Sequence, residues 1–175
     1  MAVQPRRPLL IADRVATGDK VIVDIPEPDF VRAVDFGKFL AEKWMRGREE
    51  PYAIQCASFA LGNLGELALC IHLSVPWLVD TAAAARPVIA DKWIVRTRQL
   101  PWQPLVVYQD HYRGGIGFVL ATPLEPGELP HRMVLHGWVG ADAAFVVGTR
   151  TRFDAETRPG VIVHQNKFHS MATLP

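Results

Sequence analysis

Two carboxylates stand out as candidates for chemistry because each lies in an otherwise apolar part of the sequence. Glu66 is the only formally charged side chain between Glu50 and Asp80. Burying a carboxylate is costly unless a cation, a metal ion or strong hydrogen-bond donors contact it. Two interpretations of Glu66 are open: it bonds back to a helix cap at Asn63, as in a capping box, or it is a functional carboxylate.

Asp91 is the second candidate, and it lies in a run that otherwise favours a β-strand, residues 88–97. Aspartate is disfavoured in strands, so its presence there asks for a reason. Alternation along the strand would place Asp91 on the face of Ile89 and Trp93, opposite to that of Arg96, unless a bulge shifts the register. The alternative to a functional carboxylate is an aspartate at a sheet edge or in a turn.

The remaining titratable residues carry weaker signals. The run DHYR at residues 110–113 has the residue types for acid–base catalysis, but the two glycines that follow it favour the polar tip of a hairpin. His131 and His136 lie five residues apart on one predicted strand, hence on opposite faces, which argues against a shared metal ion. The apolar neighbours of His136 predict a hydrogen-bonded core histidine.

Two helices are predicted in the first half of the chain. Asp29 is a suitable N-cap for an amphipathic helix over residues 29–47, which follows a proline-rich arm, residues 1–28, that wraps the domain or pairs at a sheet edge. After a loop, a second helix is expected to begin at Asn63 and to end before Pro76. That second helix is apolar nearly all round, which is typical of a central, buried helix.

Strands are predicted in the second half, where β-branched and aromatic runs alternate with proline and glycine. These runs cover residues 88–97, 105–109, 116–121 and 132–139. They predict a meander of three or four antiparallel strands, followed by a short helix over residues 140–147 and one more strand at residues 161–163. A helix, a meander, a second helix and a strand together predict an α+β sandwich.

Five short segments, taken in order along the chain, carry a resemblance to a known family. They are Gly65-Glu66-Leu67-Ala68, then Asp91, then Val95-Arg96-Thr97, then Leu105-Val106-Val107 with Asp110, and finally His136-Gly137-Trp138-Val139. This series resembles the PD-(D/E)XK nuclease superfamily, and most closely its small members encoded by phages or prophages. The resemblance covers roughly residues 60–145.

The resemblance implies an α+β, restriction-endonuclease-like fold with an α-β-β-β-α-β core, here over residues 60–165. All 175 residues are expected to form a single domain. The arm, residues 1–28, and an accessory helix, residues 29–47, precede the core.

The activity that the resemblance implies is Mg²⁺-dependent hydrolysis of DNA phosphodiesters, with Mn²⁺ as a substitute. Glu66 and Asp91 would be the metal ligands, since hard oxygen ligands suit Mg²⁺, and the metal would polarise the phosphate and lower the pKa of an attacking water. Arg96 occupies the lysine position of the motif and would stabilise charge on the phosphoryl group. Arg96, Arg98 and Arg113 are the expected substrate-binding residues.

The sequence also departs from the family pattern. Ile94 stands where an acid is expected two residues before the basic position, and Ala90 replaces the proline before Asp91. Arg96 is permanently protonated and cannot act as a general base. A second function is therefore open: a catalytically degenerate nuclease fold that binds DNA or a protein, in a phage or mobile-element setting. A surviving metal site would need a further ligand, such as Asp110 or Asp80.

Composition limits the partners and the location. With 19 Lys plus Arg against 18 Asp plus Glu, bulk charge cannot hold a nucleic acid, so any DNA site must be a local patch. Cys56 and Cys70 belong to no disulfide framework or zinc-ligand set and are expected to be reduced thiols. The stretch 51–79, in which Glu66 is the only formally charged residue, is broken by glycine and proline and predicts a buried segment rather than a membrane span. A cytoplasmic protein is expected.

A third function, in structural assembly, stays open because of two aromatic residues. Phe36 and Phe39 lie off the apolar stripe of the first predicted helix. They either pack under another segment or form an exposed contact surface, which would serve a homo-oligomer or a protein partner.

Overall fold

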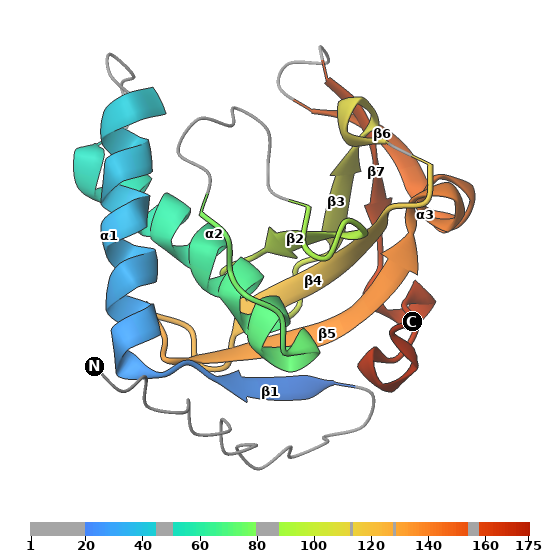
Figure 1. The fold of residues 1–175 in the computed structure, drawn as a ribbon. Helices are drawn as coiled ribbons and strands as arrows, with labels where there is room; N and C mark the ends of the chain where they lie inside the picture. Colours follow the sequence, from blue (N-terminus) through green and yellow to red (C-terminus); the bar gives the residue numbers. More distant parts are fainter. Residues whose placement is uncertain (1–19, 45–50, 80–87, 113, 128, 154–157) are drawn as a thin grey trace.

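A computed structural model describes residues 20–44, 51–79, 88–112, 114–127, 129–153 and 158–175 (Figure 1). Two helices cover one face of a four-stranded sheet, and a smaller three-stranded sheet covers the other face. One apolar core lies between the helices and the larger sheet, and a second core lies between the two sheets. The predicted α+β class is confirmed.

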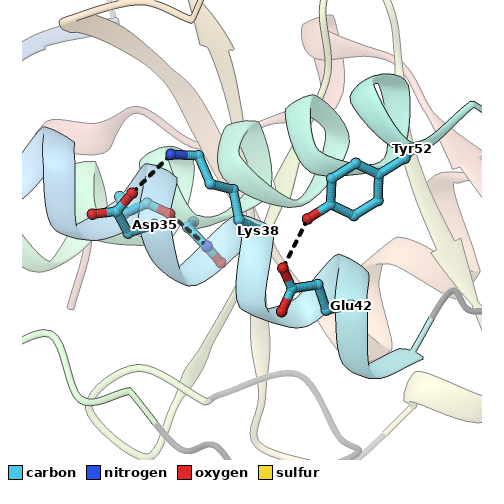
Figure 2. A network of polar contacts seen from close by, with 6 residues as sticks. Asp35, Lys38, Glu42 and Tyr52 are labelled. Carbon is cyan, nitrogen blue, oxygen red and sulfur yellow. Dashed lines mark hydrogen bonds and ion pairs between the residues drawn. The ribbon is translucent and has the colours of Figure 1, made fainter.

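The first helix, α1 (Glu27–Trp44), packs closely against the second, α2 (Tyr52–Leu73). α1 buries three small residues at spacings of four, Ala33, Gly37 and Ala41, and these let the two backbones approach each other. A Cβ atom added to Gly37 would lie 2.6 Å from the backbone nitrogen of Ala60. Polar contacts along this pair include the Asp35–Lys38 ion pair at 2.9 Å on α1 and a hydrogen bond from the Tyr52 hydroxyl to Glu42 at 3.1 Å (Figure 2).

The expected start of α2 at Asn63 is wrong. The helix begins eleven residues earlier, because residues 52–61 contain neither glycine nor proline and the interruption that follows, Gly62, costs a helix only about 1 kcal/mol. The Asn63 side chain is therefore not a cap, and it donates instead to the Ala33 carbonyl of α1 at 2.9 Å. With no helix start at Asn63, the capping-box interpretation of Glu66 is also wrong.

α2 is long and apolar enough to cross a membrane by length and composition. A core helix of a water-soluble protein passes the same test. Here α2 buries ten of its residues and packs against α1 and the larger sheet, in agreement with the predicted central helix.

The larger sheet has the strand order β1-β5-β4-β2. Its strands are β1 (Val21–Asp24), β2 (Trp93–Thr97), β4 (Gly117–Pro123) and β5 (Arg132–Gly140). β1 pairs antiparallel with β5, so the described part of the predicted arm is an edge strand, and the rest of that arm, residues 1–19, lies outside the described residues. β5 pairs antiparallel with β4, but β2 and β4 are parallel.

The predicted antiparallel meander is therefore wrong. A tight hairpin cannot join parallel strands, and the chain leaves the larger sheet after β2 through a loop that contains Pro101 and Pro104. It then forms β3 (Leu105–Tyr108) in the smaller sheet, whose order is β3-β7-β6 with β6 (Thr149–Phe153) and β7 (Arg158–Val163). Between β5 and β6 along the chain, α3 (Ala141–Val147) forms where a short helix was predicted.

Of the two predicted alternatives for Phe36 and Phe39, the structure shows packing for the first residue and exposure for the second. Phe36 packs against the core on the helix side, while the Phe39 side chain is 40% exposed. The two rings stack at 5.8 Å between centroids.

Candidate functional site

The fold gathers a compact polar group between the two sheets, around Arg96. Val95 and Thr97 pack on the helix side of β2, so the alternation of the strand directs Arg96 toward the smaller sheet. The guanidinium carbon lies 5.6 Å from the centroid of the Tyr108 ring on β3, and Nη2 hydrogen-bonds to Nδ1 of His111. Arg96 is 6% exposed and is thus a buried cation held on an aromatic ring.

His111 connects this buried cation with solvent. It ends the short helix η1 (Gln109–His111), and its Nε2 lies 3.8 Å from Oδ1 of Asp110, with side-chain exposures of 26% and 57% for the two residues. Because Arg96 donates to Nδ1, the hydrogen bond assigns the ring proton of neutral His111 to Nε2. We call Arg96, Tyr108, Asp110 and His111 the arginine site.

This donor set suits an anion with several oxygens. A guanidinium stacked on an aromatic ring presents its N–H groups as a planar fork, the geometry that phosphate and carboxylate accept best. Arg98 follows β2 directly, two residues after Arg96, and its Nε donates to the Pro104 carbonyl at 3.3 Å. It therefore adds a second, partly exposed cation about 7 Å along the chain from the first. Arg113, the third predicted substrate-binding residue, lies outside the described residues.

The two predicted metal ligands occupy different places. Glu66 is buried in α2 at 9% exposure, and the preceding Gly65 packs against Thr97 at the carboxyl end of β2. Asp91 is exposed and precedes the amino end of the same strand. Five strand residues span about 13 Å, so β2 separates the two positions by roughly its own length.

The strand predicted over residues 88–97 begins only at Trp93, because residues 89–92 form a turn. Ala90 and Asp91 have φ angles of 50° and 55°, and the Lys92 amide donates to the Ile89 carbonyl at 3.1 Å. Aspartate tolerates this left-handed conformation better than most residues. The turn interpretation of Asp91 is therefore the one that the structure supports.

Ile94, which stands where the family pattern expects an acid, cannot bind a metal ion. Ile94 is 6% exposed and packs in the core between the two sheets with Phe118 and Val139. Among the described residues, no group of three His, Cys, Asp or Glu side chains is arranged to hold a metal ion. Asp80, one of the residues considered as a further ligand, lies outside the described part of the chain.

The carboxylate of Glu66 instead affects the pKa of a thiol one helical turn away, that of Cys70. Burial, together with the charge of Glu66, raises the pKa of Cys70 to about 12. Cys70 is thus an unreactive core thiol, as expected, since only the thiolate is an effective nucleophile. Cys56 is also free and is partly exposed.

A second buried polar group lies on β4 and β5 of the larger sheet. Nε2 of His136 lies 2.8 Å from the hydroxyl of Thr122, and both residues are buried. Burial and, to a smaller extent, the charge of Lys20 lower the pKa of His136 to about 4, although a hydrogen bond with Gln165 partly opposes the shift. His136 is therefore neutral at physiological pH, and the predicted hydrogen-bonded core histidine is confirmed.

The unfolding free energy is expected to fall as the pH drops from about 6.5 to about 4. In that window unfolded His136 takes up a proton and folded His136 does not, so the loss is at most about 1.4 kcal/mol per pH unit. Urea unfolding of the wild type and of His136→Gln measures the effect, and the slope against pH should flatten in the variant. His164→Gln, at an exposed position, is the control; an equal slope in all three proteins contradicts the assignment.

Sequence reasoning found Arg96 but not its partners. Tyr108 looked like an interior residue of the strand predicted over residues 105–109, and His111 looked like part of the polar tip of a hairpin. Instead, residues 109–111 form η1 and contact β7, and this brings His111 onto Arg96. The polar run at residues 110–113 did carry the signal, but the two glycines that follow it favoured a hairpin tip over a site.

No family model, curated protein or solved structure matches this chain. The chemistry of the arginine site and the positions of the two carboxylates are therefore the basis for a function.

Proposed function

We propose that this protein is a binding module on a catalytically degenerate nuclease-like fold, and that it binds the phosphate backbone of DNA at the arginine site. The observation that carries the proposal is the buried guanidinium of Arg96, held over Tyr108 and hydrogen-bonded to His111. Arg96 is also the residue that takes the basic position of the nuclease motif.

Phosphate is the ligand that these donors favour. Hydrogen bonds between a guanidinium and a phosphate are charge-assisted and frequently bidentate. His111 lies at the exposed side of the site with an N–H at Nε2, and Arg98 supplies a second cation nearby. Such a local group of donors is what a chain of net charge +1 needs, because its overall charge gives little attraction to a polyanion.

Binding is favoured over hydrolysis by the positions of the carboxylates. Metal-dependent cleavage needs acidic oxygens gathered around one metal ion beside the phosphate. Glu66 is buried near the carboxyl end of β2, Asp91 is exposed before its amino end, and Ile94 is enclosed in an apolar core. Removing the carboxylate of Asp91 should therefore matter little.

The affinity of Asp91→Asn for DNA is expected to stay within about twofold of the wild type. Asparagine accepts the left-handed φ of this turn as readily as aspartate does, so the fold should be unchanged. Fluorescence anisotropy with a labelled oligonucleotide measures the affinity. A tenfold change in either direction would place Asp91 at the DNA and contradict its assignment to a solvent-exposed turn.

The proposed function is tested by the same titration in EDTA and in Mg²⁺, followed by a denaturing gel of the DNA. We expect dissociation constants in the micromolar range at low salt, equal in both buffers, and intact DNA. Mg²⁺-dependent cleavage that is lost in Asp91→Asn would overturn the proposal in favour of a nuclease. An absence of binding to any DNA would overturn it in favour of a protein partner.

A further inference from the structure

Trp102 is the most exposed large aromatic residue of the described chain, at 72%, and it lies in the loop between β2 and β3. Exposing an indole is unfavourable by roughly 25 cal/mol per Å² of apolar surface, and such residues are enriched in recognition surfaces. Nothing in the sequence-based candidate site uses this residue.

The loop that carries Trp102 is held in one conformation. The Leu100 amide donates to Oε1 of Gln103 and the Gln103 amide donates to the Leu100 carbonyl, both at 3.1 Å. Gln165, beyond β7, donates through Nε2 to the Pro101 carbonyl. Pro101, directly before Trp102, restricts the backbone further. The loop is therefore ordered before a ligand binds, and binding loses little conformational entropy there.

The same loop is joined to Arg98, the cation that follows Arg96 along the chain. The hydrogen bond from Arg98 to the Pro104 carbonyl at 3.3 Å closes residues 98–104 on themselves. Arg98 therefore connects the end of β2, which carries Arg96, with the loop that carries Trp102, while His111 lies beyond the other end of β3. Cations that contact phosphates, next to a flat exposed ring, form the combination that binds single-stranded nucleic acids.

We infer that Trp102 stacks on an unpaired nucleobase and that the ligand of the module is single-stranded nucleic acid. The inference rests on the proposed phosphate-binding function and adds the class of ligand. In a duplex, the faces of internal bases are covered by their neighbours, so an indole on a surface loop reaches a base face only in a single strand or at an open end. Stacking is tolerant of sequence because every base has a π face.

The test compares two labelled oligomers of equal length and charge. One is a single-stranded oligothymidylate, and the other has the same backbone with abasic sites in place of every base. Trp102→Ala is expected to weaken binding of the oligothymidylate by about 5- to 150-fold, the range for one lost base–aromatic stack, and to leave the abasic oligomer within about twofold. Trp102→Phe should retain most of the affinity.

The matched control is Trp44→Ala, which removes another exposed tryptophan, 44% exposed and at the end of α1, and should change neither affinity. If the wild type binds both oligomers and Trp102→Ala binds the oligothymidylate equally well, the stacking inference is wrong while the proposed function stands. Equal weakening for both oligomers also overturns stacking. If the wild type binds neither oligomer, the phosphate-binding function itself fails.

Discussion

Replacing Arg96 with methionine is expected to raise the dissociation constant for DNA by about 10- to 150-fold. Methionine is similar in volume to arginine and keeps an unbranched apolar stem, but it removes the charged fork and the guanidinium contact with Tyr108. A hydrogen bond to a charged group contributes about 1.5–3 kcal/mol, which corresponds to that range. Anisotropy titrations in EDTA measure the change.

Arg132→Met is the matched control for this variant, because it removes the same charge from the same protein. Arg132 begins β5, is exposed, and pairs with Glu125 at 2.7 Å, away from β2. Its loss should alter the affinity by less than threefold. Equal effects of the two substitutions would mean that only net charge matters. His111→Ala provides an independent check, since it removes the exposed Nε2–H donor while leaving Arg96 in place, and it should weaken binding several-fold.

Replacing Gly37 with alanine is expected to lower the free energy of unfolding by about 2–3 kcal/mol. The added methyl carbon would lie 2.6 Å from the nitrogen and 2.8 Å from the Cα of Ala60, and both atoms belong to a helix backbone that cannot rotate away. The helices must move apart, and over-packing of this kind typically costs 1–3 kcal/mol. Urea unfolding followed by circular dichroism measures the loss.

Gly62→Ala makes the same chemical change on α2, but the new methyl group meets nothing within 4 Å. Alanine is the better helix former, so this variant should be more stable than the wild type by about 0.5–1 kcal/mol. A stable Gly37→Ala protein would show that α1 and α2 do not pack as closely as described.

Much of the local structure could be predicted from the sequence. The apolar spacing of α1, the short helical pattern of α3 and the β-branched and aromatic run of β5 are properties of neighbouring residues, and those elements form close to where they were expected. The predictions were wrong where contacts between residues far apart in the sequence determine the structure. Asn63 is a good cap in isolation, but within α2 its side chain bonds to α1, thirty residues away.

The pairing of strands was also not encoded locally. β2 and β4 are each strand-like by composition, yet their parallel pairing depends on the crossing of the intervening chain to the smaller sheet. For the same reason Arg96 could be found by its place in a motif, whereas Tyr108 and His111 could not, since they reach it from the other layer. Asp91 looked like part of a strand because its apolar neighbours mask a turn with two left-handed residues.

The salt dependence of binding tests the central claim most directly, because it counts phosphate contacts. For single strands, the slope of log affinity against log salt changes by about 0.7 for each phosphate that a cation neutralises. Measured in EDTA with a single-stranded oligonucleotide, the slope should be smaller by about 0.7 in Arg96→Met than in the wild type and unchanged in Arg132→Met. Identical slopes in the wild type and Arg96→Met would contradict a phosphate contact at Arg96.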